Sequence, residues 1–129
     1  MREFVIMTDS CCDMTAKMAA DLELEVLPLS LHMGAQEYRN LLDGSEIGFQ
    51  DFYNRIRSGE EATTSAISVG AFEERMRPIL RQGRDILCIN FSSALSTTYQ
   101  SAAIAAEDMR AEFPEAKVLV VDSLCASLC

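Results

Sequence analysis

The sequence is poor in the residues and patterns that several classes of protein need. It has a single histidine, His32, so a zinc site built from histidine and cysteine is not expected, and we predict no metal site. No apolar run approaches the roughly 20 residues of a membrane-spanning helix. The short apolar run near the N-terminus lacks the small-residue cleavage site of a signal peptide. We therefore expect a protein that is not membrane-spanning and has no signal peptide.

Positive charge is also scarce. The chain has 11 Lys and Arg residues against 20 Asp and Glu residues, which gives a formal net charge of -9. Such a balance argues against nucleic acid or an anionic membrane surface as the main partner. The five cysteines are odd in number and have no disulfide-type spacing, so we expect reduced thiols and a cytoplasmic location.

Apolar residues make up 49% of the 129-residue chain, which is enough for the core of one domain. Compact apolar runs predict buried parallel strands at residues 4–7, 85–91 and 117–121. Residues 24–33 predict a further strand, interrupted or at a sheet edge because of Pro28.

Helical spacing of apolar residues predicts helices over residues 14–22, 49–58, 69–81 and 98–112. Polar loops are expected at residues 41–48 and 60–68. The alternation of strands and helices predicts an α/β fold, with a mainly parallel sheet flanked by helices and a single domain over residues 1–129.

The densest group of hydroxyl side chains lies where the strand at 85–91 ends and the helix at 98–112 begins. Five of the seven residues from Ser92 to Thr98 are serine or threonine. Free N–H groups at a helix N-terminus attract anions, and hydroxyls both donate and accept hydrogen bonds. The loop is therefore a candidate site for a carboxylate or phosphate; helix capping is the alternative interpretation. A phosphate-binding loop is not supported, because the segment has no glycine and no lysine.

Other polar groups have two interpretations each. The cluster Thr63-Thr64-Ser65 is either a second ligand-binding group or a capping segment. Asp9 and Asp122 each follow a strand, so they could hold a metal or act as bases, or they could simply accept loop N–H groups. Because the carboxyl ends of parallel strands share one edge, the clusters at residues 8–10, 91–93 and 121–123 are expected to converge there. A catalytic serine is not supported, since no Gly-x-Ser-x-Gly motif is present.

Several of these motifs occur together in one known family. They are Thr8-Asp9-Ser10 with Asp13, Val26-Leu27-Pro28-Leu29, Thr64-Ser65, the block from Phe91 to Ala102, and Val121-Asp122-Ser123. In this order they resemble the N-terminal domain of the DegV family over nearly the whole chain. The resemblance implies a three-layer α/β lobe, with the second lobe of a two-lobe protein absent.

The resemblance also implies a function. DegV-like proteins bind a long-chain fatty acid between two lobes, and in fatty-acid kinase systems they present its carboxylate to a separate kinase. The family pattern places the carboxylate contacts at Thr64 and Ser93, with Ser65, Ser92 and Ser96 as weaker candidates. We therefore expect a lipid-binding protein that is not an enzyme and needs no cofactor. The alternatives are a metal-assisted phosphoryl- or acyl-transfer enzyme using Asp9 or Asp122, and a truncated remnant that binds nothing.

Overall fold

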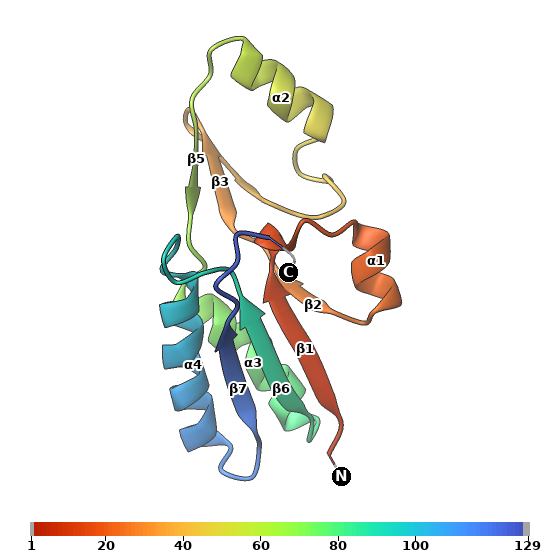
Figure 1. Ribbon diagram of the computed structural model, residues 1–129, viewed down its shortest axis with the longest axis vertical. Helices are drawn as coiled ribbons and strands as arrows, with labels where there is room; N and C mark the ends of the chain where they lie inside the picture. Colours follow the sequence, from red (N-terminus) through yellow and green to blue (C-terminus); the bar gives the residue numbers. More distant parts are fainter. Residues whose placement is uncertain (1, 128–129) are drawn as a thin grey trace.

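The strands form two separate sheets in the computed structural model, which describes residues 2–127 (Figure 1). A parallel sheet has the order β2-β1-β6-β7, and a smaller antiparallel sheet has the order β4-β3-β5. The parallel strands are β1 (Phe4–Asp9), β2 (Glu25–Leu27), β6 (Asp85–Asn90) and β7 (Val118–Asp122). The antiparallel strands are β3 (Ser30–Met33), β4 (Gln36–Arg39) and β5 (Ala62–Ser65). The predicted α/β class and the parallel sheet flanked by helices are confirmed.

Each predicted helix is present, and side-chain capping marks the start of two of them. The helices are a short 3-10 turn η1 (Ser10–Cys12), α1 (Ala16–Asp21), α2 (Phe49–Arg57), α3 (Val69–Arg81) and α4 (Thr98–Glu112). The Thr15 side chain accepts a hydrogen bond from the N–H of Met18, and the Ser68 side chain accepts one from Ala71, so each caps the helix that follows it. Helix α3 continues past Pro78 without a break.

The main core lies between the parallel sheet and helices α3 and α4, which pack against each other on that side. The predicted apolar stripe of α3 is buried throughout: Phe72, Met76, Ile79 and Leu80. Helix α4 contributes the small side chains Ala102, Ala105 and Ala106, which allow close approach. Alternate residues of β1 and β6 complete this core: Val5, Met7, Ile86 and Cys88.

The antiparallel sheet was not predicted. Residues 60–68 were expected to be a loop, but Ala62–Ser65 forms strand β5 and pairs with β3. The prediction was wrong because Thr63 and Thr64 gain their strand conformation from pairing with a distant segment, while their own pattern is that of a hydroxyl cluster. The interruption expected at Pro28 is confirmed, since the chain leaves the parallel sheet at Leu27 and enters the antiparallel sheet at Ser30.

The two sheets are joined at the buried Ser10, which follows β1. The Ser10 hydroxyl accepts hydrogen bonds from the Leu29 N–H at 3.0 Å and from the Asn40 Nδ2 group at 3.2 Å. The Asn40 N–H in turn donates to the Leu29 carbonyl at 2.8 Å. These bonds fix both ends of the β3–β4 hairpin to the carboxyl edge of the parallel sheet.

Candidate functional site

The polar clusters that follow three parallel strands meet at the carboxyl edge of the sheet, as predicted. Asp9 after β1 accepts a hydrogen bond from the Phe91 N–H after β6, at 2.9 Å. The Ser93 N–H donates to Asp122 Oδ1 after β7, at 3.1 Å, and the Ser123 N–H donates to the Asn90 carbonyl. These cross-strand bonds hold the loops after β1, β6 and β7 in one connected edge.

Asp9 links the loops that follow β1 and β6 at this edge. Its side chain is buried, with 1% of the residue exposed, and its two oxygens accept from three donors: Cys11 N–H, Phe91 N–H and Asn90 Nδ2. A buried carboxylate with three hydrogen-bond partners has few lone pairs left for a metal ion. The structure therefore supports the interpretation of Asp9 as a residue that fixes the loops.

Most hydroxyls of the Ser92–Thr98 loop are engaged within the loop itself. Ser92 is buried, and its Oγ accepts from the Ala94 N–H at 3.3 Å. The Ser96 hydroxyl accepts from the Thr98 N–H and shares a 2.9 Å hydrogen bond with the Thr98 hydroxyl. Capping and loop closure thus account for Ser92 and Ser96, the two weaker candidates of this loop.

Ser93 is half-buried and points toward Asp122. The hydrogen bond from the Ser93 hydroxyl, followed by those from the Ser93 and Leu124 N–H groups, lowers the pKa of the Asp122 carboxyl below its ordinary value. The Asp122 carboxylate therefore lies within hydrogen-bonding reach of Ser93. A ligand carboxylate would compete with Asp122 for the hydrogen bonds of Ser93.

A pocket of about 320 Å³ lies beside this edge, between η1, the antiparallel sheet and helix α2. That volume is at the lower end of the range for small-molecule sites. Its walls are mainly apolar and include Met14, Leu31, Leu41, Leu42, Ile47, Phe49, Phe52 and Tyr53. The polar lining residues are Ser10, Asp13, Arg39, Asn40 and Thr64. An apolar pocket with a few polar groups suits a ligand with a long apolar body.

Strand β5 presents its two candidate residues in different directions. Thr64 lies opposite Leu31 in the β3–β5 pairing, and both residues line the pocket. Because side chains alternate along a strand, Ser65 is on the other face of the sheet. There its hydroxyl lies 2.8 Å from His32 Nε2. Among the residues that the structure describes, no hydrogen bond joins Thr64 to Ser93, and Thr64 lines the pocket whereas Ser93 is not one of its lining residues.

The sequence pattern predicts the helix at residues 49–58, but it does not predict that the aromatic residues of this helix line a pocket. Phe49 is 57% exposed and Tyr53 is 55% exposed, although both line the pocket together with the half-buried Phe52. The only sequence signal for this role in the pocket is the strong amphipathic pattern of residues 49–57. Residues 39–42, which line the pocket together with α2, have no sequence pattern that predicts a binding site.

No group of three or more His, Cys, Asp or Glu side chains within residues 2–127 is arranged to hold a metal ion. In the same part of the chain, no helix is long and apolar enough to cross a membrane.

Cys11, Cys12 and Cys88 are free thiols, as predicted, but Cys125 is disulfide-bonded, so the expectation of reduced thiols is wrong for that residue.

Cys11, in the 3-10 turn η1, is expected to be unreactive. Burial, and then the negative charges of Asp9 and Asp13, raise the pKa of the Cys11 thiol to about 11. From an ordinary value of 9.0, this shift lowers the thiolate fraction at pH 8 roughly a hundredfold. Iodoacetamide labelling of Cys11, followed by tandem mass spectrometry, should therefore be about a hundredfold slower in the native protein than in urea. The native rate should rise with pH up to about 11; equal native and unfolded rates at pH 8 would contradict the assignment.

Comparison with known proteins gives one consistent result. Residues 3–129 match the model of a family described as uncharacterised proteins of the DegV family. The DegV domain-containing protein CPE0026 of Clostridium perfringens is 38% identical over 128 residues, which cover 99% of this chain and 44% of that protein. This chain thus spans less than half the length of the curated relatives it matches.

Two solved structures share the fold. A DegV family protein from Thermus thermophilus, described for its fatty acid binding, is 34% identical with a TM-score of 0.82; the match covers 99% of this chain and 43% of that one. A stearic-acid-binding protein from Eubacterium ventriosum is 28% identical with a TM-score of 0.83, over 93% of this chain and 41% of that one. With a family match over residues 3–129, the chain belongs to the DegV family.

Proposed function

We propose that this chain binds a long-chain fatty acid, with the acyl tail in the pocket beneath α2 and the carboxylate held by Thr64 and Ser93. The observation that carries this proposal is the pocket of about 320 Å³, which has a mainly apolar wall and Thr64 among its polar lining residues. The family relatives described as binding stearic acid and other fatty acids support the ligand class.

The tail supplies most of the affinity in this proposal, and the head group sets the position. Each buried methylene contributes about 0.8 kcal/mol. The carboxylate of the fatty acid must compete with the carboxylate of Asp122, which accepts a hydrogen bond from the Ser93 N–H. The fatty-acid carboxylate binds when the Ser93 hydroxyl donates to the ligand. Ser65, Ser92 and Ser96 have no part in this scheme, since their hydroxyls make the local bonds described above.

The first test is mass spectrometry of the natively purified protein, followed by titration with palmitate. We expect a co-purifying fatty acid in the native protein and roughly tenfold weaker palmitate binding in Thr64→Ala and in Ser93→Ala, the loss typical of one hydrogen bond to a charged group. Thr63→Ala is the matched control, because Thr63 is exposed on the opposite face of β5. Absence of any bound lipid, with no measurable palmitate binding, would favour the interpretation as a non-binding remnant.

We further propose that the chain corresponds to the N-terminal lobe of a two-lobe protein that presents the acyl carboxylate to a separate fatty-acid kinase in the cytoplasm. The matched share of the relatives, 44% in CPE0026, supports the division into lobes. A kinase from the same genome should form acyl phosphate from ATP and palmitate only when the whole two-lobe protein is added. Equal formation without that protein would contradict the presentation step. A metal-assisted transfer enzyme is not proposed, because Asp9 and Asp122 are occupied by loop N–H groups.

A further inference from the structure

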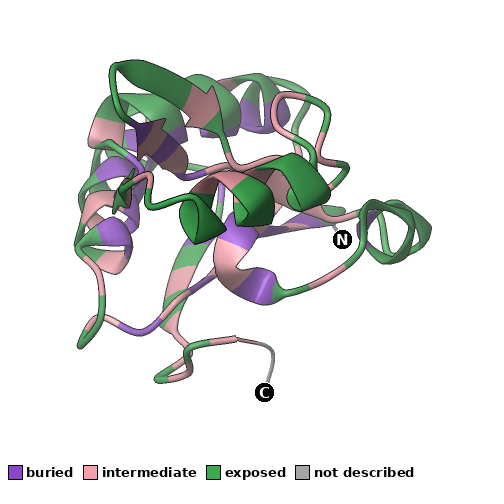
Figure 2. Ribbon diagram, turned by 90° about the horizontal axis from the view of Figure 1, so that it is seen from above, coloured by how far each residue is buried: buried purple, intermediate pink, exposed green. Residues whose placement is uncertain are grey.

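Helix α2 forms the outer wall of the pocket, yet apolar packing does not hold it in place. None of its residues is buried, and three of its aromatic side chains line the pocket: Phe49, Phe52 and Tyr53. Figure 2, which looks down on the molecule, shows this helix with only exposed and intermediate residues. A helix of this length is marginal without packing partners, so other contacts must position it.

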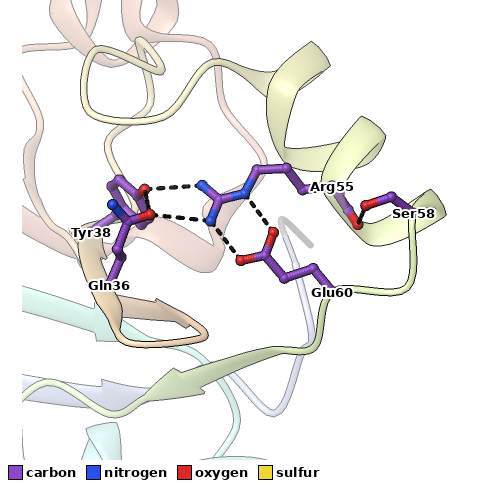
Figure 3. A network of polar contacts seen from close by, with 5 residues as sticks. All are labelled: Gln36, Tyr38, Arg55, Ser58 and Glu60. Carbon is purple, nitrogen blue, oxygen red and sulfur yellow. Dashed lines mark hydrogen bonds and ion pairs between the residues drawn. The ribbon is translucent and has the colours of Figure 1, made fainter.

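The contacts at its C-terminal end come from one guanidinium group (Figure 3). Arg55 donates two hydrogen bonds to the Glu60 carboxylate, from Nε at 2.7 Å and from Nη2 at 2.6 Å. It also donates to the Tyr38 hydroxyl at 2.9 Å and to Gln36 Oε1 at 3.2 Å, both on strand β4. The Arg55 side chain is 23% exposed, and its bidentate geometry is the strongest available to an arginine–carboxylate pair.

A second pair attaches the segment that leads into α2. The Glu46 carboxylate accepts from both the backbone N–H and the Nε of Arg39, at the end of β4. The stretch from residue 41 to residue 59 is therefore fastened near both ends to the same strand. Between these two points, Glu46 and Arg55, four residues line the pocket: Ile47, Phe49, Phe52 and Tyr53.

We propose that α2 is a lid over the fatty-acid pocket and that Arg55 is the positioning residue that latches it closed. Opening breaks the Arg55 bonds to Tyr38 and Gln36 on strand β4 and uncovers the aromatic wall. Glu60, whose N–H donates to the Arg55 carbonyl at 3.1 Å, adjoins the last turn of α2 and stays paired with Arg55. Closing over an acyl tail covers the exposed rings of Phe49 and Tyr53, so the ligand itself completes the packing of the helix. The identity of the ligand rests on the proposed function, whereas the latch itself does not.

The latch is tested first without ligand, by hydrogen exchange of the α2 amides. In Arg55→Gln, exchange in residues 49–57 should be roughly tenfold faster than in the native protein, the size expected for loss of a charge-assisted network. Arg57→Gln is the matched control: it has the same charge change in the same helix turn, but among the residues that the structure describes the Arg57 side chain donates a hydrogen bond only to Asn54. Arg55→Lys should lie between the two, because a lysine cannot make the bidentate contact. Equal exchange in all four proteins would overturn the latch.

The second test measures the kinetics of a fluorescent fatty acid, cis-parinaric acid, by stopped flow. Arg55→Gln should release the probe roughly tenfold faster than the native protein, the factor by which the open state increases. Arg57→Gln should match the native rate. If the native protein and Arg57→Gln bind the probe but Arg55→Gln releases it at the same rate, the lid role is wrong. If no variant binds the probe, the proposed function fails, and hydrogen exchange alone decides the latch.

Discussion

The Asp9→Ala protein is expected to be destabilised by about 4 kcal/mol, the largest stability effect of any single change at the carboxyl edge. The change leaves three donors without an acceptor: Cys11 N–H, Phe91 N–H and Asn90 Nδ2. Each buried donor that loses its partner costs about 1–3 kcal/mol. A domain has a free energy of unfolding of about 5–15 kcal/mol in total. The Asp9→Ala protein would therefore lose a large share of its stability.

Urea unfolding followed by circular dichroism measures this effect. Asp13→Asn is the control, since Asp13 is exposed and has a left-handed backbone with φ of 53° that asparagine also adopts. We expect the control to change the free energy of unfolding by less than about 0.5 kcal/mol. An Asp9→Ala protein that kept its stability but lost a metal-dependent turnover would favour the transfer-enzyme alternative over the structural role of Asp9.

The Phe49→Asp protein is expected to bind palmitate at least tenfold more weakly than the native protein while it stays folded. Phe49 lines the pocket but is 57% exposed, so its removal leaves no cavity in the core. An acidic residue at the start of a helix is favoured by the helix dipole, which protects α2 from the change. Lost contact with about two methylenes, at about 0.8 kcal/mol each, corresponds to about a tenfold weaker affinity. The new carboxylate also opposes burial of an acyl chain.

Isothermal titration with palmitate measures the Phe49→Asp effect, and thermal unfolding checks the fold. Gln50→Asp is the matched control, because it adds the same charge one residue later, at an exposed position outside the pocket lining. We expect Gln50→Asp to bind as the native protein does. Equal weakening in both variants would indicate a general effect of negative charge, and unchanged binding in Phe49→Asp would place the acyl tail elsewhere.

Helix α3 and the parallel strands could be predicted from the sequence because their patterns are local. The apolar stripe of α3 from Phe72 to Leu80 recurs at helical spacing, and β1, β6 and β7 each contain a compact apolar run. The expectation that β7 is a buried strand is wrong for Leu119 and Val121, which are exposed because β7 is the edge strand of the parallel sheet. Convergence of the clusters near Asp9 and Asp122 followed from the fold class, since parallel strands end at one edge. The fatty-acid ligand class came from the family motifs, and no periodicity or composition would have suggested it.

The sequence by itself thus determined the parallel sheet, its helices and the polar edge where the strands end. Only the tertiary structure decided what lies beside that edge. Strand β5 exists because Thr64 pairs with Leu31, which is 33 residues earlier, and that pairing turns Thr64 toward the pocket and Ser65 away from it. The position of α2 depends on contacts between Arg55, Glu60 and strand β4, so it follows from pairings across the chain that no local pattern carries.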